Sequence, residues 1–352
     1  MMSFRGRLKD FRIPQSTSWL LTDIAEAKGR QALYKKQAPQ ILKALLEMAL
    51  IQSTESSNRI EGVTVEADRL RPLVLGSVRP KDRSEREILG YRRALSLIHT
   101  RAAELHVTAE VLRELHRTIQ PDSGDAGEWK KVSNEITEVR PGQAPVIRFR
   151  PVSVEQTPAA MDELCVSYRH AIDQEGVQPP VALAALVLDF LCIHPFRDGN
   201  GRVSRLLALV GLYHHGIEVG RYISLERLVE ETKEDYYEVL KESSVGWHEG
   251  KHDLIPWMNY FLGGVRRAYR MFGERAGKVT SARGAKTGLL LDAIQAYVGD
   301  FTAADLQGAV PGVSLDLVRR VLDRERRKGN LICVGRGRAA KWRRNIGTKG
   351  GN

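Results

Sequence analysis

The stretch that decides the fold is His194-Pro195-Phe196-Arg197-Asp198-Gly199-Asn200-Gly201-Arg202-Val203-Ser204-Arg205. It lies between two strongly apolar segments whose composition is that of buried helices. Pro195 ends the first helix, because the residue before a proline is biased away from helical angles. Gly199 and Gly201 are expected to give the backbone access to positive φ. Polar residues held between two buried helices predict a functional loop.

The side chains of this loop have the properties of a phosphoryl- or nucleotidyl-transfer site. A glycine-rich turn that opens a helix points several backbone N–H groups at one spot, which makes an anion site. Arg202 and Arg205 are three residues apart, so both can reach one polyphosphate. Asp198 is the one carboxylate of the loop and suits Mg²⁺. His194 can accept a proton near neutral pH.

The loop and four other segments resemble a known family. The spaced residues His194-Pro195-Phe196-x-Asp198-Gly199-Asn200-Gly201-Arg202-x-x-Arg205 are similar to the signature of the Fic adenylyltransferases. The resemblance covers about residues 30–265 and continues in Glu87-Ile88-x-x-Tyr91-x-x-Ala94-Leu95, Leu112-x-x-Leu115-His116, Gly127-Glu128-Trp129-Lys130 and Asp235-Tyr236-Tyr237-x-x-Leu240. Lys130 stands where many relatives have Arg, at a position without a role in the transfer step.

The resemblance implies transfer of AMP from ATP to a protein hydroxyl. His194 would be the general base that deprotonates a Ser, Thr or Tyr side chain of the target, whose oxygen attacks the α-phosphate while pyrophosphate leaves. Asp198 would hold Mg²⁺ between the α- and β-phosphates. The backbone from Gly199 to Gly201, with Asn200, would hold the phosphates, and Arg202 and Arg205 would hold the β and γ ends. ATP is therefore the expected substrate and Mg²⁺ the expected cofactor.

Aromatic residues and a hairpin complete the site that the resemblance implies. Phe196 is expected to anchor the loop in the core. Tyr237 is expected to line the adenine pocket, with Tyr236 beside it less clearly assigned, and both can also be interpreted as core aromatics. A hairpin predicted from β-type segments at 132–139 and 146–152 matches the family's flap, which docks the target segment by strand addition.

A second motif, Ser57-Asn58-Arg59-Ile60-Glu61-Gly62, ends a long predicted helix. Gly62 suits the residue just past a helix end. A carboxylate in the last turn opposes the helix dipole, so Glu61 is expected to have a partner elsewhere. The segment resembles the family's inhibitory motif, which implies that Glu61 pairs with Arg205 and keeps that arginine from the γ-phosphate. Ser57, one turn earlier, would steady Glu61 or the phosphates.

The bulk composition is that of an ordinary globular chain. Of 352 residues, 42% are hydrophobic and 28% charged. No apolar run is long enough to span a bilayer, no secretory signal is visible, and the three cysteines are far apart, so no membrane partner and a cytoplasmic location are expected. His214 and His215 lack spaced metal-ligating partners and are interpreted as ordinary helix-end residues.

The spacing of apolar residues predicts a mainly α fold with the hairpin as its flap. Helices are expected at 40–61, 85–103, 111–119, 154–170, 181–193, 201–215, 226–244 and 251–272. The expected domains are an N-terminal helical region with the inhibitory helix (1–105), a Fic core (106–272), a linker (273–287) and a winged-helix domain (288–346). The last has helices at 289–297, 302–309 and 315–328, a Pro311-Gly312 turn, and strands around a Gly/Arg-rich turn at 335–338.

The C-terminal domain carries most of the net charge. Residues 278–352 hold 15 Lys and Arg against six Asp and Glu, a local charge of +9 out of +11. Basic side chains lie on the third helix and the wing, namely Arg319, Arg320, Arg324, Arg326, Arg327, Lys328, Arg336 and Arg338. DNA is therefore an alternative partner, besides a target protein on the 132–152 hairpin and a second copy of the chain.

Other functions stay open at this point. The chain could be a DNA-binding regulator with a Fic core that senses a ligand, or a Fic enzyme that uses another NTP, transfers a phosphate or removes AMP. A phosphotransferase departs at the loop glycines, and Gly199 and Gly201 are both present. The target protein, the preferred nucleotide and the oligomeric state are not fixed by the sequence.

Overall fold

A computed structural model describes residues 3–5, 8–37, 39–138, 146–277, 285–297, 299–310, 313–335, 337 and 340–345. About 65% of the chain is helical, with a small β-hairpin, as the apolar spacing predicts. No helix among these residues is both long and apolar enough to cross a membrane. Cys165, Cys192 and Cys333 are free thiols.

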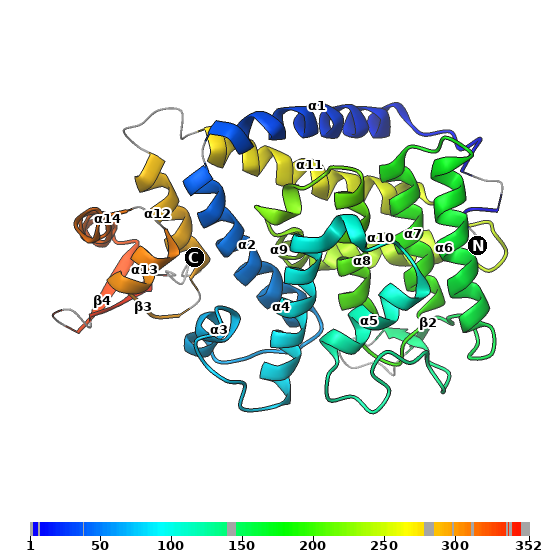
Figure 1. Cartoon of the computed structure of the whole chain (residues 1–352), viewed down its shortest axis with the longest axis horizontal. Coiled ribbons are helices and arrows are strands. Elements are labelled where there is room, and N and C mark those ends of the chain that lie inside the picture. The colour runs from blue at the N-terminus through cyan, green and yellow to red at the C-terminus, as the bar shows by residue number, and fades with distance from the viewer. Residues whose placement is uncertain are drawn as a thin grey trace, which may run out of the picture.

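Two buried helices form the centre of the molecule (Figure 1). They are α7 (Pro179–Ile193) and α8 (Asn200–His214), and nearly every side chain of both is buried. The helices packed around them are α4 (Arg83–Arg101), α5 (Ala109–Ile119), α6 (Thr157–Asp173), α10 (Lys233–Ser244) and α11 (Ile255–Gly277). The functional loop therefore joins the two most deeply buried helices, which hold both of its ends in fixed positions.

The N-terminal helices cover this core from one side. The long α2 (Pro39–Ile60) packs against α4 and α9 and ends next to the loop before α8. Two other helices were not predicted, α1 (Gln15–Gln37), which lies along α11, and the short α3 (Ala67–Val74) (Figure 1). The sequence of α1 is polar with weak apolar periodicity, so only its packing against α11 reveals it as a stable helix.

The segment 226–244, predicted as one helix, is two. The helix α9 (Leu225–Glu231) ends at Thr232, and α10 begins at the next residue. The Thr232 hydroxyl hydrogen-bonds to the Leu228 carbonyl (2.9 Å) and to the Tyr260 hydroxyl (2.8 Å). Side-chain hydroxyls that compete for backbone partners bend or end helices, and here that competition separates α9 from α10. Short 3₁₀ turns, η1 (Ala102–Glu104) and η2 (Val219–Arg221), connect other helices.

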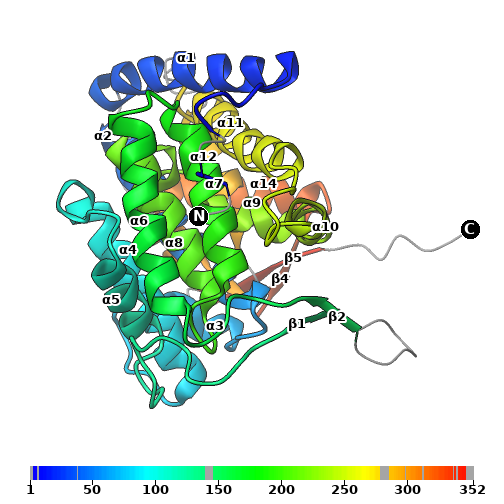
Figure 2. The same cartoon turned by 90° about the vertical axis from the view of Figure 1, so that its right-hand side faces the viewer.

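The hairpin is present but shorter than predicted. Its strands, β1 (Ile136–Glu138) and β2 (Val146–Phe149), are antiparallel, with Glu138 opposite Val146. The predicted turn lies outside the described residues. Figure 2 shows the hairpin projecting from the loop side of the core. The Phe149 ring stacks on His248 (centroids 5.3 Å apart), so the base of the hairpin is fixed against the residues that follow α10.

The C-terminal part forms a separate small unit beyond α11. Its elements are α12 (Ala285–Ala296), β3 (Phe301–Thr302), α13 (Ala303–Ala309), α14 (Leu315–Arg327), β4 (Leu331–Val334) and β5 (Lys341–Arg344). The antiparallel sheet has the order β3-β5-β4. The strand β3 was not predicted, and helical structure extends into both ends of the predicted linker at 273–287. The turn at 311–312 and the wing residues Arg336 and Arg338 lie outside the described residues.

The C-terminal unit packs against α2 and α3 (Figure 1). At this contact the Arg71 guanidinium lies 5.6 Å from the centroid of the Tyr297 ring and forms an ion pair with Glu47 (2.8 Å). The helix α2 is thus in contact with the C-terminal unit along its length and with the functional loop at its end.

Candidate active site

The two glycines of the loop have different backbone conformations. His194 caps α7 with φ 52°, and among the described residues it is the only non-glycine with positive φ. Gly199 has φ 81° directly before α8, as expected. Gly201 is a helical residue of α8, which agrees with the helix predicted from this residue onward. The Glu61 carboxylate lies against Gly201, where a Cβ would displace it.

Asn200 has a different role from the one expected. Its side-chain Oδ1 accepts a hydrogen bond from the Phe196 N–H (3.0 Å), and its Nδ2 donates to the Phe196 carbonyl (2.8 Å). The amide is buried, and its oxygen and its nitrogen each bond inside the loop. Its side chain therefore fixes the loop, and only its backbone N–H, one of the unpaired donors at the start of α8, remains to meet an anion.

His116 supports the loop from α5 by stacking on Phe196. Their rings stack with centroids 3.9 Å apart, and Phe196 is fully buried, which confirms it as the core anchor. The Gly127 N–H donates to His116 Nδ1 (2.8 Å), so His116 Nε2 carries the proton and donates to the Asp198 carbonyl (3.0 Å). This hydrogen bond fixes the backbone at the proposed metal ligand.

Lys130 and Asn134 hold the start of the loop. The Lys130 N–H donates to the Pro195 carbonyl (2.8 Å), and its ammonium donates to the Ile193 carbonyl (3.1 Å) and to Oδ1 of Asn134 (2.9 Å). The Asn134 amide donates to the Phe196 carbonyl (3.0 Å). Lys130 therefore holds the loop through both its backbone and its side chain.

His194 has the geometry of a base whose proton-accepting nitrogen is free. Its Nδ1 lies 3.2 Å from the Leu191 carbonyl, so Nδ1 carries the proton and Nε2 has the lone pair. Burial lowers the pKa of His194 to about 4, with Lys130 adding to the shift, although the hydrogen bond to Leu191 and nearby Glu61 raise it. The ring is thus neutral at physiological pH, as a general base must be.

Asp198 presents its carboxylate to solvent at the loop surface. Its side chain is 66% exposed. One oxygen, Oδ1, accepts from the Gly199 N–H (2.6 Å), and Oδ2 accepts from Nε2 of Gln120 (2.9 Å). Two hydrogen bonds orient the carboxylate and leave lone pairs for a hard cation.

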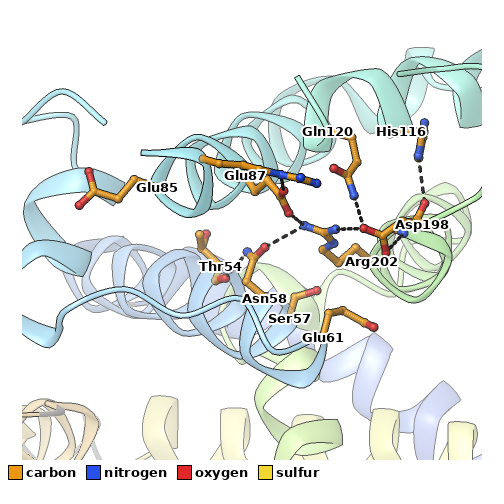
Figure 3. Close-up of polar contacts among 12 residues, drawn as sticks. Thr54, Ser57, Asn58, Glu61, Glu85, Glu87, His116, Gln120, Asp198 and Arg202 are labelled. Atoms are coloured by element: carbon orange, nitrogen blue, oxygen red, sulfur yellow. Dashed lines mark hydrogen bonds and ion pairs between the residues drawn. The ribbon is translucent and has the colours of Figure 1, made fainter. Parts of the chain in front are cut away.

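The two arginines of the motif are buried and already paired with acidic residues, and Figure 3 shows the pair that Arg202 forms with Glu87. Arg205, 7% exposed, donates from Nη2 to Oε1 of Glu61 (2.8 Å) and to the Ser57 carbonyl (2.9 Å), and from Nε to the Ser57 hydroxyl (2.8 Å). Arg202, 1% exposed, donates from Nη1 to Oε2 of Glu87 (2.7 Å). The predicted contact between Glu61 and Arg205 is therefore present.

Each arginine keeps a buried nitrogen with no hydrogen-bond partner, namely Nε of Arg202 and Nη1 of Arg205. A Cβ on Gly201 would lie 3.3 Å from that Nη1, so the nitrogen faces the start of α8. Buried unpaired donors are costly unless a ligand satisfies them. These donors, the first N–H groups of α8 and the exposed Asp198 carboxylate fit a polyphosphate with a divalent cation.

Residues 106–212 match the Fic/DOC family model. The chain contains a Fic/DOC family domain. The match covers α5, both strands of the hairpin, α6, α7, the loop and α8 up to Leu212, and leaves the N-terminal helices, α9 to α11 and the C-terminal unit outside.

Curated relatives of this Fic domain are named protein adenylyltransferases. That of Nematostella vectensis is 24% identical over 228 residues, covering 62% of this chain and 48% of its own length. That of Caenorhabditis elegans, fic-1, is 26% identical over 207 residues, covering 57% of this chain and 37% of its own length. The chain thus spans about half, or less, of the length of these relatives.

Solved structures of Fic proteins share the fold. A Fic family protein from Desulfovibrio desulfuricans superposes with a TM-score of 0.61 at 22% identity, covering 97% of this chain and 99% of its own. A Fic domain containing signaling protein from Bacteroides thetaiotaomicron has a TM-score of 0.59 at 24% identity, covering 73% of this chain and 98% of its own. At these identities the likeness concerns the fold.

The Fic domain has a small cavity in front of His194. It has a volume of about 120 Å³ and is lined by Glu61, Tyr237, Ile136 and Phe149 besides His194. This is below the roughly 300–1,000 Å³ typical of small-molecule sites. The Glu61 carboxylate, which lies against Gly201, forms part of the wall of this cavity.

The two neighbouring tyrosines have different surroundings. Tyr237 is half exposed and lines the cavity, which agrees with the position expected of an adenine contact. Tyr236 is buried and packs edge-on against Trp257. Tyr236 therefore has the packing of a core residue, although one edge of its ring also reaches the cavity.

The histidine pair at the end of α8 has ordinary structural contacts. His214 bonds the Ala102 carbonyl (2.7 Å), and His215 bonds the Tyr168 hydroxyl (3.2 Å). Within the described ranges no group of three or more His, Cys, Asp or Glu side chains could hold a metal ion.

Five residues around the Fic loop received no role from the sequence, namely Glu87, His116, Gln120, Lys130 and Asn134. Three of them, Glu87, His116 and Lys130, lie in segments that carry the family resemblance. Their place in these segments is a signal that could have identified them. Gln120 and Asn134 have no such signal. Only their contacts with the loop reveal them.

Proposed function

We propose that this chain transfers AMP from ATP to Ser, Thr or Tyr side chains of other proteins, and that Glu61 holds it in a low-activity state. The observation that carries the proposal is the Glu61–Arg205 ion pair (2.8 Å), whose Glu61 carboxylate lines the same small cavity as His194. The names of the curated relatives support the reaction class.

The chain's own residues account for each part of the transfer step. His194 Nε2 accepts the proton of the target hydroxyl. The hydroxyl oxygen then forms a bond to the α-phosphorus as the bond between that phosphorus and pyrophosphate breaks. The α8 N–H groups and the free nitrogens of Arg202 and Arg205 stabilise the negative charge of the phosphates. Asp198 would hold Mg²⁺, which when bound neutralises phosphate charge. A target segment would add as a strand to the β1–β2 hairpin.

Glu61 would compete with the nucleotide for Arg205. Its carboxylate satisfies Nη2 of Arg205 and sits against Gly201, at the positive end of the α8 dipole. That is where a phosphate would bind. Displacement of Glu61 would release Arg205 and enlarge the cavity.

Mass spectrometry of the intact protein after incubation with each NTP and Mg²⁺ tests the reaction, with wild type and Glu61→Gly compared. The expected result is a mass increase of AMP from ATP, larger in the variant. An increase of a phosphate or of another nucleotide would overturn the proposed chemistry. Loss of AMP from protein modified beforehand would identify the reverse reaction.

The pH dependence of transfer should reflect the lowered pKa of His194. The neutral ring is the active form, so kcat/KM in the Glu61→Gly protein is expected to decline only as the pH approaches about 4, well below 6.5. The Glu61→Gly change does not move this acidic decline to higher pH. The charge of Glu61 raises the pKa of His194, so its removal can only lower that pKa further. A decline centred at pH 6.5 or above would show that His194 is not the base.

The lowered pKa of His194 also affects the stability of the folded protein, and this effect provides a control for the pH dependence of transfer. Because the pKa is lower in the folded state, the stability due to neutral His194 is present above pH 6.5 and is lost as the pH falls toward 4. Thermal unfolding measured at each pH therefore separates loss of base function from loss of folded enzyme.

We further propose that the C-terminal unit is a winged helix that binds duplex DNA. The element order from α12 to β5 and the sheet order β3-β5-β4 support this fold. Arg320 and Arg327 on α14 have 71% and 77% exposed side chains, although both pair with acidic residues of the same helix.

Retention on duplex DNA is expected to fall steeply with salt, and Arg319→Ala with Arg320→Ala should lower the slope by about one per residue. Arg5→Ala, an exposed arginine on the Fic side, is the matched control and should leave the slope unchanged. Absence of retention at low salt would rule out this partner.

A further inference from the structure

The helix α4 reaches the motif through a buried ion pair. Nη1 of Arg202 donates to Oε2 of Glu87 (2.7 Å) and lies 3.4 Å from Oδ1 of Asn58. The Glu87 side chain is 6% exposed, and its other oxygen accepts from Nε of Arg83 (2.8 Å). Both ends of the pair are thus removed from water, and Figure 3 shows Glu87 on the opposite side of Arg202 from the loop.

The other end of the same guanidinium faces the proposed metal ligand. Nη2 of Arg202 lies 3.6 Å from Oδ2 of Asp198, beyond an ordinary hydrogen bond. The same oxygen accepts from Nε2 of Gln120 (2.9 Å). Arg202 therefore stands between two carboxylates, bonded closely to Glu87 and only loosely associated with Asp198.

We propose that Glu87 is a positioning residue that keeps Arg202 from capturing Asp198, so that the Asp198 carboxylate stays available to a nucleotide-bound divalent cation. This inference rests on the proposed function. Glu87 contacts neither the cation nor the nucleotide. It acts through Arg202.

Charge balance is the physical reason. A buried arginine needs a carboxylate close by, because an unpaired buried charge is costly. Glu87 provides this carboxylate: its Oε2 lies 2.7 Å from Nη1 of Arg202, on the side away from the loop. Without the charge of Glu87, Asp198 is the carboxylate 3.6 Å away that can compensate Arg202. The guanidinium would then close on Oδ2 and compete with the cation for its lone pairs.

A matched residue on the same helix separates this role from a purely structural one. Glu85, two residues earlier, is fully buried and forms an equally close pair with Arg69 (2.6 Å), far from Asp198. Glu85→Gln and Glu87→Gln both remove the charge of a buried ion pair from α4. They differ in whether the remaining arginine faces Asp198.

Binding of Mn²⁺ in the presence of a non-hydrolysable ATP analogue, followed by electron paramagnetic resonance, tests the proposal. The full chain with Glu61→Gly serves as the parent, because Glu61 no longer restricts the site. Glu87→Gln is expected to weaken Mn²⁺ binding on the order of 10–100-fold, as loss of a residue that orients a metal ligand does. Glu85→Gln should bind Mn²⁺ as the parent does. In an Asp198→Asn background the effect of Glu87→Gln should disappear, because the two act in series.

Equal Mn²⁺ binding by Glu87→Gln and the parent, or an equal loss in Glu85→Gln, would overturn the proposal. If Glu87→Gln does not fold, as judged by thermal unfolding, Glu87→Asp replaces it. This variant keeps the charge and shortens the reach, so a smaller loss is expected, and none would again overturn the proposal. Because Mn²⁺ binding needs no transfer, failure of the AMP-transfer reaction is distinguishable from failure of this inference.

Discussion

Replacing His194 with Ala is expected to slow transfer about 10²–10⁴-fold while ATP remains bound. The imidazole is the one group of the loop that can accept the hydroxyl proton, and its Nε2 is free because Nδ1 is held by the Leu191 carbonyl. The groups that fit the phosphates lie elsewhere, on α8 and its arginines, so nucleotide affinity should change little. The measurement is auto-modification with labelled ATP in the Glu61→Gly protein, together with equilibrium binding of ATP.

A matched variant shows that the loss is specific to the loop. His170→Ala removes a histidine with a 58% exposed side chain on α6, and its rate should equal that of the parent. Transfer at the parent rate in His194→Ala would refute the base assignment. Loss of both transfer and ATP binding would show instead that His194 supports the loop, whose backbone it holds with φ 52°.

Replacing Glu61 with Gly is expected to raise auto-modification by roughly 10–100-fold. The carboxylate forms a charge-assisted hydrogen bond with Arg205, and such bonds contribute about 1.5–3 kcal/mol. Since about 1.4 kcal/mol is tenfold in rate, release of this contact corresponds to one to two orders of magnitude. The rate of AMP incorporation at saturating ATP measures the effect.

The control for Glu61→Gly is a carboxylate that lies away from Arg205. Glu66, shortly after α2, has a 69% exposed side chain and pairs only with Lys81 in the described structure, so Glu66→Gly should leave the rate unchanged. Ser57 and its carbonyl still bind Arg205 in Glu61→Gly, so the fold around Arg205 should persist. An unchanged rate in Glu61→Gly would show that the ion pair does not restrain the enzyme.

Local sequence was sufficient for the elements nearest the loop. The apolar run before His194 and the one after Arg205 predict α7 and α8, because burial of both faces leaves a continuous apolar pattern. Pro195 and Gly199 mark the turn by their backbone preferences alone. The helix predicted from Gly201 onward is also present, and the structure adds that the distant Glu61 carboxylate lies against this glycine.

Weakly patterned elements could not be predicted in the same way. The polar α1 is stabilised by α11, more than two hundred residues later, and β3 gains its order from β5. The break between α9 and α10 depends on a Thr232 hydroxyl that also meets Tyr260. In each case the partner that stabilises the element is farther away in the sequence than the short window over which apolar periodicity predicts a helix or strand.

Residue types at short spacing were enough to locate the loop and to propose His194 as its base, Asp198 as its metal ligand and its two arginines as phosphate contacts. Only the tertiary structure decided what those arginines bind. Glu61 is separated from Arg205 by 144 residues and Glu87 from Arg202 by 115, and packing of α2 and α4 against α8 brings each pair together. Burial of both arginines makes these contacts strong, since a charge removed from water must be compensated by whatever lies closest.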